Sequence, residues 1–295
     1  MLKYRLVSAI GLLSLLFTAL FWKGQIGAFV FTLLSCGMVA IAVKEFFTMM
    51  EKVGFKGYKK LTMIVGVLMV LSVAVPAFLT EKSIVFTEFE TILMFSFIIL
   101  GFFRVFKSED IKNNLLQHFI SIGALMYLAW MLNFIAKTYF IAGTEMSGRY
   151  LVLFLILVTK CSDIGAYFTG KTCSQIPNRE NHKIAPKLSP GKSWEGFFGG
   201  IVFSVVMALV LVTFLGDKMV INGQAILAYP SAIFLGITFA TLGFFGDIAE
   251  SVLKRSSGMK DSGSILPGMG GVMDVVDSLT LVAPLFYCYI RLVLA

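Results

Sequence analysis

Long apolar stretches recur along the whole chain, separated by short polar breaks. Each is close to the ~20 residues that a helix needs to cross the ~30 Å hydrocarbon layer of a bilayer. Runs such as 151–158 and 201–214 are apolar on every side, whereas the strands of a transmembrane barrel alternate in polarity. Since unpaired backbone groups are costly in lipid, helices are the expected spanning structures. The sequence therefore predicts an all-α integral membrane protein.

We expect about nine transmembrane helices. Only 14% of the residues are charged, against roughly 25% in an ordinary soluble domain, which excludes a water-soluble fold. The fourth expected span is the shortest. The spans are residues 4–22, 26–46, 61–79, 90–106, 116–141, 149–170, 194–216, 228–255 and 276–294.

The distribution of Lys and Arg predicts the orientation. With the N-terminus in the cytoplasm, 18 of the 25 basic residues fall in inside segments. Six fall outside, namely Lys23, Lys82, Lys137, Arg149, Lys218 and Arg291, and Lys160 lies within a span. By the positive-inside rule the N-terminus is cytoplasmic and the C-terminus is outside, in the cytoplasmic (inner) membrane. The net charge of +8 then reflects topology and attraction to anionic lipids, and nucleic acid is not an expected partner.

The two halves of the chain differ in their polar residues. Residues 1–145 contain spans and routine loops, and we identify no site there, so this region is expected to be a scaffold with dimer contacts. Residues 146–295 contain longer cytoplasmic loops at 171–193 and 256–275, rich in Pro, Gly, Lys and Asp. Carboxylates also lie in the adjoining spans, where ionisable groups mark function or a buried pair. The second region is therefore the expected catalytic region.

Two intramembrane carboxylates, Asp163 and Asp247, lie at similar depth, on the order of 10 Å below the cytoplasmic mouth. The second begins a stripe at helical spacing on one helix face: Asp247, Glu250, Ser251, Lys254 and Arg255. The stripe has two interpretations. It faces protein or water at a functional site, or it is an intrahelical ladder from Asp247 through Ser251 to Lys254 at a snorkelling helix end.

Two further carboxylates, Asp274 and Asp277, share the first turn of the last span. One aspartate at a helix start is commonly a cap. Together with Asp247 they offer three hard oxygen ligands at a water-accessible mouth, which suits Mg²⁺. Glycines before this helix and cations near them are suited to binding a phosphate group. The glycines are Gly268, Gly270 and Gly271, and the cations are Lys254, Arg255 and Lys260. The combination predicts phosphoryl or nucleotidyl transfer.

Other patterns favour different interpretations. Residues 165–172 satisfy the P-loop spacing, but they lie in and at the end of an expected membrane helix, which is the wrong context. Lys171 remains a candidate phosphate contact. Gly196 and Gly200 have the spacing of close helix packing. The two histidines lie near no candidate nucleophile, and no Cys/His spacing fits zinc, so covalent catalysis is not expected.

Four segments of the second half carry a family resemblance. They are SDIGAYFTGK at 162–171, SPGKSWEG at 189–196, GDIAES at 246–251 and the long stretch SVLKRSSGMKDSGSILPGMGGVMDVVD at 251–277. In this order they closely resemble the CDP-diglyceride synthetases, also called phosphatidate cytidylyltransferases. Two positions depart from that family: Met269 stands where it usually has His, and Val275 where it usually has Arg. A role for that imidazole as acid or base is therefore not carried over.

The resemblance implies transfer of a cytidylyl group from CTP to phosphatidic acid, giving CDP-diacylglycerol and pyrophosphate. It implies Mg²⁺ with K⁺ as an accompanying ion, surrounding membrane lipids and a homodimer. The expected catalytic residues are Asp247, Lys254, Lys260, Asp261, Asp274 and Asp277, with Asp247, Asp274 and Asp277 as the metal ligands. The expected substrate and phosphate-binding residues are Asp163, Lys171, Ser189, Lys192, Ser193, Glu195, Ser251, Arg255, Gly268, Gly270 and Gly271.

Two alternatives stay open. One is a CTP-dependent enzyme that acts on another lipid phosphate or a lipid alcohol. The other is a cation-coupled transporter in which Asp163 and Asp247 bind the ion, although no counterpart of the Asp247 stripe occurs in the first half. The sequence does not predict acyl-chain preference, CTP against dCTP, the dimer interface or the lipid access route.

Overall fold

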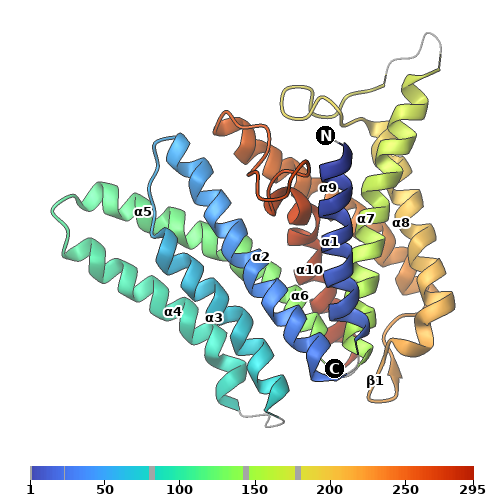
Figure 1. The fold of residues 1–295 in the computed structure, drawn as a ribbon, viewed down its shortest axis with the longest axis horizontal. Coiled ribbons are helices and arrows are strands. Elements are labelled where there is room, and N and C mark those ends of the chain that lie inside the picture. Colours follow the sequence, from blue (N-terminus) through green and yellow to red (C-terminus); the bar gives the residue numbers. More distant parts are fainter. Residues whose placement is uncertain (1, 23, 80–83, 142–145, 177–180) are drawn as a thin grey trace. The chain divides into compact units, whose positions relative to one another are not determined.

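The computed structural model describes residues 2–22, 24–79, 84–141, 146–176 and 181–295 (Figure 1). Lys23 and Lys82, which we expected outside, and residues 177–180 of the expected cytoplasmic loop lie outside this part. Helices make up the secondary-structure elements of the described residues, apart from one hairpin of two short strands, β1 (Val220–Ile221) and β2 (Gln224–Ala225). The all-α prediction is therefore confirmed.

Ten α-helices account for most of the described residues. They are α1 (Leu2–Phe21), α2 (Gln25–Lys52), α3 (Lys59–Phe78), α4 (Ile84–Phe106), α5 (Ile111–Ala124), α6 (Met131–Tyr139), α7 (Met146–Ser174), α8 (Trp194–Leu215), α9 (Tyr229–Ser256) and α10 (Met273–Val293). A π-helical stretch, η1 (Leu125–Trp130), joins α5 to α6, and a 3₁₀ turn, η2 (Gly216–Lys218), follows α8.

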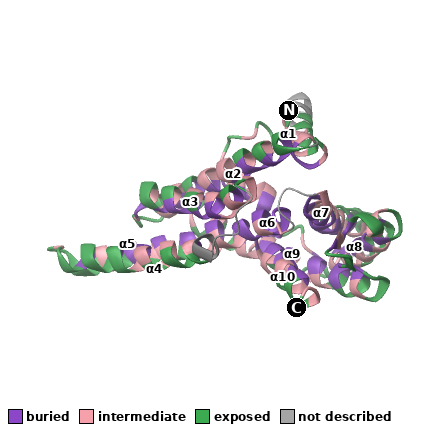
Figure 2. Ribbon diagram, turned by 90° about the horizontal axis from the view of Figure 1, so that it is seen from below, coloured by how far each residue is buried: buried purple, intermediate pink, exposed green. Residues whose placement is uncertain are grey.

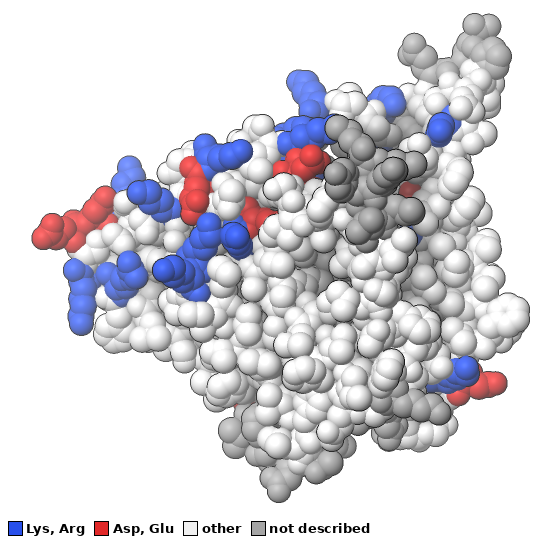
Figure 3. All heavy atoms as spheres, in the orientation of Figure 1, with Lys and Arg blue, Asp and Glu red and all other residues white. Residues whose placement is uncertain are grey.

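Eight spans among the described residues are long and apolar enough to cross a membrane. One of them, Ile111–Tyr139, combines α5, η1 and α6. The first expected span corresponds to α1, whose described apolar part, Ser8–Phe21, is shorter than the others. On the face drawn in Figure 3, a wide region carries no Lys, Arg, Asp or Glu. The chain is thus an integral membrane protein, and the count of nine spans stays a prediction.

The chain divides into two compact units. The first contains Met1–Thr144 and Ser256–Val275, and the second contains Glu145–Arg255 and Val276–Ala295. In the first unit, α2 packs against α1 and α3. Phe31 stacks on Tyr139, with ring centroids 3.8 Å apart, and the Tyr139 hydroxyl donates to the Ala19 carbonyl at 2.7 Å. Exposed residues are frequent along α4 and α5 (Figure 2), as expected for apolar helices that face lipid.

Three buried phenylalanines from three helices form the core of the second unit. Phe154 of α7, Phe239 of α9 and Phe286 of α10 have ring centroids 5.3 to 6.0 Å apart. Small residues bring α7 and α8 together. A methyl group at Gly196 would lie 2.9 Å from the Ala166 carbonyl oxygen, and one at Gly200 would lie 3.0 Å from that of Ser162. Close packing at the glycines of α8 is therefore confirmed.

This packing predicts that Gly200→Leu destabilises the protein. The added side chain must enter space next to the α7 backbone, and overpacking of this kind commonly costs about 1 to 3 kcal/mol. Thermal denaturation of the purified protein in detergent should show a lower midpoint. Gly37→Leu in α2 is the matched control, because a Cβ there would have no heavy atom within 4 Å. Equal midpoints for the two variants would contradict the packing argument.

Candidate active site

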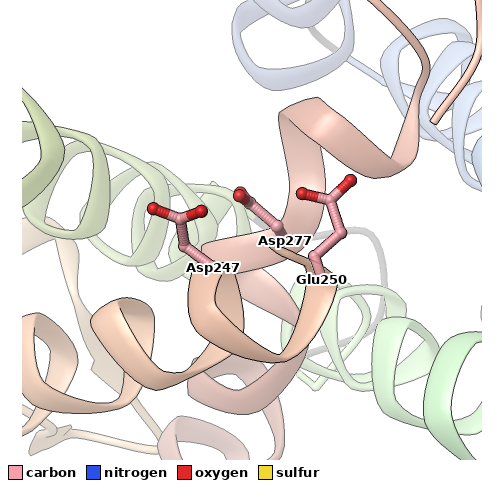
Figure 4. A group of neighbouring side chains, drawn as sticks. All are labelled: Asp247, Glu250 and Asp277. Carbon is pink, nitrogen blue, oxygen red and sulfur yellow. The ribbon is translucent and has the colours of Figure 1, made fainter. Parts of the chain in front are cut away.

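Three carboxylates of the second unit form one group. Asp247 and Glu250 lie three residues apart on α9, and Asp277 comes from the first turns of α10 (Figure 4). One oxygen atom from each lies within 4.8 Å of the others. Gly246 permits this approach, since a Cβ at that position would collide with the Asp277 carbonyl oxygen. These three residues are called the acidic group below.

Each carboxylate of the acidic group has a lysine beside it. Lys192 Nζ lies 3.0 Å from Asp247 Oδ2, and Lys254 Nζ lies 2.9 Å from Glu250 Oε2. Lys160 Nζ lies 3.9 Å from Asp277 Oδ1. Such pairing offsets the cost of holding charged groups inside apolar helices. The group thus offers both carboxylate oxygens for a cation and ammonium groups for an anion.

Lys160 also connects the expected residue Asp163 to this region. Its Nζ lies 3.1 Å from Asp163 Oδ2 and donates to Ser278 Oγ at 2.9 Å, and Ser278 Oγ donates in turn to Asp163 at 3.2 Å. Sequence reasoning left Lys160 aside as a residue within a span. The sequence could have indicated this contact. Lys160 and Asp163 are three residues apart, so they lie on the same side of one membrane helix.

The ion pairs correct one interpretation of the α9 stripe. An intrahelical ladder from Asp247 to Lys254 was one alternative, but Lys254 pairs with Glu250, and Asp247 pairs with Lys192 from a separate segment. Ser251 is buried on the same helix. The stripe therefore contacts other segments of the chain through Asp247 and Arg255, while Glu250 and Ser251 are buried.

The residues of the 189–196 segment have mostly local roles in the structure. Ser193 is the N-cap of α8 and accepts from Gly196 N at 3.2 Å, and Ser189 closes a turn by accepting from Lys192 N. The Glu195 carboxylate accepts from His182 N at 3.2 Å. These contacts hold the segment that presents Lys192 to Asp247.

Two further expected cations lie at helix ends. Arg255 Nε donates to the Leu188 carbonyl at 3.2 Å, which ties the end of α9 to the loop before α8. Lys171 is exposed in the last turn of α7, with its Nζ 5.7 Å from the centre of the Tyr167 ring. Residues 165–172 are continuous helix, so the P-loop fold is excluded as expected.

Asp274 binds the glycine-rich segment of the first unit. Its Oδ2 accepts from Gly271 N at 2.7 Å, from Ser262 N at 2.8 Å and from Ser262 Oγ at 2.9 Å. Gly268 and Gly270 have φ values of 80° and 93°, a conformation that favours glycine. This carboxylate thus holds the turn before α10, and whether it also binds a metal stays a prediction.

Glu45 of α2 is a buried carboxylate that sequence reasoning did not connect to the glycine-rich segment. It is 4% exposed. Its Oε1 accepts from Val272 N at 3.0 Å, and its Oε2 accepts from Met273 N at 2.9 Å and from Ser262 Oγ at 3.1 Å. The carboxylate therefore caps the N-terminus of α10, where free N–H groups favour a negative charge. Its position inside an apolar span was the signal available from sequence.

The contacts of Glu45 also explain why glycine occupies two positions of the glycine-rich segment. A Cβ at Gly263 or Gly271 would lie 2.5 Å from a Glu45 carboxylate oxygen. The segment can approach the buried carboxylate only because these positions carry no side chain. Residues 1–145 thus supply, from α2, the anchor of the 256–272 segment, and the expectation that they contain no site stays a prediction.

The donor set of the acidic group fits a divalent cation. Among the described residues it is the one cluster of three carboxylate, His or Cys ligands close enough to hold a metal ion together. Carboxylate oxygens are the ligands that Mg²⁺ prefers, with water and phosphate oxygens at its remaining positions. Of the three expected ligands, the acidic group contains Asp247 and Asp277, and Glu250 is the third member.

The fold and site together define a polytopic helical membrane protein with a charged site built on its last two helices. A family comparison identifies the class further. The model of the cytidylyltransferase family matches residues 3–293. The chain belongs to this family.

Curated relatives support the same grouping. The chain is similar to a phosphatidate cytidylyltransferase of Haemophilus influenzae, with 35% identity over 176 residues, covering 59% of this chain and 57% of that protein. It is 38% identical over 172 residues to the Escherichia coli protein YnbB, which is described as uncharacterized, covering 58% and 51%. A phosphatidate cytidylyltransferase of Staphylococcus saprophyticus is 37% identical over 142 residues, covering 48% and 49%. The chain spans about half the length of the curated relatives it matches.

The Glu45 contacts predict that Glu45→Gln loosens the 256–272 segment. An amide has one acceptor oxygen, so at least one backbone N–H of the α10 N-terminus loses its partner. Hydrogen exchange measured by mass spectrometry should become faster in peptides from this segment and stay unchanged in α7. Glu51→Gln on the same helix is the matched control, since the Glu51 side chain is 50% exposed. Unchanged exchange in Glu45→Gln would refute the anchoring role.

Proposed function

We propose that the protein is a phosphatidate cytidylyltransferase that transfers CMP from CTP to phosphatidic acid. The observation that carries the proposal is the acidic group with a lysine beside each carboxylate, in a chain that belongs to the cytidylyltransferase family. Names of two relatives, from Haemophilus influenzae and Staphylococcus saprophyticus, support the choice of phosphatidate as the acceptor.

In the proposed reaction an oxygen of the lipid phosphate attacks the α-phosphorus of CTP. The new P–O bond joins CMP to the lipid phosphate, and the bond between the α- and β-phosphates breaks, which releases pyrophosphate. The product is CDP-diacylglycerol. This displacement needs no nucleophile from the protein, because positioning and charge stabilisation supply much of the rate enhancement.

We assign Mg²⁺ to Asp247 and Asp277, with Glu250 as a further oxygen donor and K⁺ as an accompanying ion. When bound, Mg²⁺ supplies positive charge that offsets the charge developing on the phosphates. Lys160 and Lys192 orient the carboxylates and present ammonium groups to the substrate phosphates. We retain Asp274 as a candidate ligand, although one of its oxygens already accepts three hydrogen bonds.

The other expected residues keep proposed roles that fit their positions. Lys254, Lys260, Lys171 and Arg255 are candidate phosphate contacts from the cytoplasmic side. Gly268, Gly270 and Gly271 supply a turn that lets backbone N–H groups approach an anion. Lys260 and Asp261 are both exposed at the 256–272 segment, where a water-soluble nucleotide can reach them.

We further propose nine membrane crossings, with α1 as the ninth, a cytoplasmic N-terminus and an outside C-terminus in the inner membrane. The 171–193 and 256–275 loops then face the cytoplasm, where CTP is available. A lipid headgroup and a soluble nucleotide can meet at this interface. Assembly as a homodimer, with contacts from the first unit, belongs to the same proposal.

The direct test incubates the purified protein with labelled CTP, Mg²⁺ and phosphatidic acid. CDP-diacylglycerol should form only when all three are present. Diacylglycerol and other lipid phosphates replace phosphatidic acid in parallel reactions, and a preference for one of them would replace the proposed acceptor. Failure of every lipid to become labelled would refute the cytidylyltransferase proposal.

Asp247→Asn and Asp277→Asn should each lose well over nine-tenths of this activity, because each removes a charged oxygen donor. One decade corresponds to about 1.4 kcal/mol of barrier, too little for loss of a catalytic metal ligand. Yield after detergent extraction should stay close to wild type. Asp217→Asn, an exposed aspartate of the same unit, is the control and should keep full activity. Asp274→Asn belongs in the same series, with hydrogen exchange of residues 256–272 as a second measurement.

Cysteine labelling tests the orientation. In a background without the native thiols, Ser264→Cys should resist an impermeant reagent in intact cells and react after permeabilisation, since Ser264 is exposed in a loop expected inside. Gln224→Cys in the hairpin after α8 should react without permeabilisation. The reverse pattern would invert the topology and exclude a cytoplasmic site.

A further inference from the structure

A polar stripe on α2 lines a pocket of the first unit. Lys44, Thr48 and Lys52 are spaced four residues apart, so they share one face of the helix. All three line a pocket of about 550 Å³. Pockets for small molecules are commonly about 300 to 1,000 Å³. The other lining residues are Glu45, Gly258, Met259, Lys260, Asp261, Ser262, Gly263, Ser264 and Ile265.

Two segments of the first unit form the walls of the pocket. The rigid wall is the last two turns of α2. The opposite wall is the 258–265 part of the glycine-rich segment, which Glu45 fixes through Ser262 Oγ at 3.1 Å and through the backbone N–H groups of Val272 and Met273. The same buried carboxylate that caps α10 therefore sets the distance between the two walls.

The charged side chains that line the pocket favour the binding of an anion. Its ammonium groups come from Lys44, Lys52 and Lys260, and its carboxylates come from Glu45 and Asp261. Glu45 is buried, and its two oxygens accept hydrogen bonds from the backbone N–H groups of Val272 and Met273, so it is already compensated. The three lysines are exposed and outnumber the remaining carboxylate. The open side of the pocket is thus cationic.

We propose that this pocket binds a phosphate group of a substrate through Lys44, Lys52 and Lys260. The inference rests on the proposed function for the two sources of that phosphate, which are the polyphosphate chain of CTP and the headgroup of phosphatidic acid. It adds Lys44 and Lys52 of α2 to the residues proposed to contact phosphate. Lys44 is the key residue, because it lies deepest of the three in the candidate span Gln25–Lys52, eight residues before its end.

The simpler explanation is that Lys44 and Lys52 only orient the helix by the positive-inside rule. Lys60, in the first turn of α3, separates the two explanations. Lys60 is exposed, lies eight residues after Lys52 in the chain and does not line the pocket. A role in topology or in general attraction of anions predicts equal effects at all three positions, whereas a phosphate site predicts effects only at Lys44 and Lys52.

Steady-state kinetics of charge-neutral variants provide the first test. Lys44→Gln and Lys52→Gln should each raise the KM of one substrate about tenfold, which corresponds to about 1.4 kcal/mol of lost binding. Lys60→Gln should change KM less than about twofold, as expected for an exposed charge without a ligand. A rise in the KM of CTP identifies the nucleotide phosphates as the occupant. A rise in that of phosphatidic acid identifies the lipid phosphate.

Protection of a thiol tests binding without turnover. In the background without native cysteines, Thr48→Cys places a thiol in the pocket, and its rate of reaction with N-ethylmaleimide is measured in detergent. Pyrophosphate and CTP should slow the reaction if the nucleotide phosphates bind there. Dispersed phosphatidic acid should slow it if the lipid phosphate binds. Cytidine and diacylglycerol, which lack the phosphate, should not.

The outcomes distinguish this inference from the proposed function. Protection by a phosphate compound in a protein without cytidylyltransferase activity would support the pocket and refute the activity. Normal activity with no protection by any phosphate compound, and with equal KM values for Lys44→Gln, Lys52→Gln and Lys60→Gln, would overturn the pocket alone. Equal protection by cytidine would also overturn it, because recognition would then not depend on phosphate.

Discussion

The structure depends on how charged groups are held inside apolar helices. Ionised side chains are costly there unless they are paired or hydrogen-bonded. The acidic group satisfies this constraint with a lysine beside each carboxylate, Lys192, Lys254 or Lys160. Glu45 satisfies it with two backbone N–H groups and a serine hydroxyl. Charge is therefore concentrated at a few places where several elements meet, and these places are the candidate sites.

The start of α10 carries two different uses of aspartate. Asp274 accepts hydrogen bonds from the segment before the helix, and Asp277, three residues later, belongs to the acidic group of the second unit. One short stretch of chain thus connects the glycine-rich segment to the charged cluster.

Much of the fold followed from the sequence because hydrophobicity alone decides it. Apolar runs of sufficient length form helices in a bilayer, where the backbone must satisfy its own hydrogen bonds. The expected span at 90–106 proved longer, beginning at Ile84, and the expected span at 116–141 contains the π-helical stretch η1. Average hydropathy predicts neither the earlier start of α4 nor the π-helical stretch. The glycine contacts of α8 were predictable from spacing, since small residues four apart permit close approach.

The sequence by itself determined the helical membrane fold, the glycine-rich loops of the second half with carboxylates in the adjoining spans, and the resemblance of its motifs to a family. Only the tertiary structure decided which residues contact the buried carboxylates. Lys192 reaches Asp247 from a loop 55 residues earlier in the chain, and Glu45 of α2 reaches Val272 and Met273 at the start of α10. The physical reason is that helical periodicity specifies which residues share a face of one helix, whereas a contact between segments far apart in sequence depends on how those helices pack.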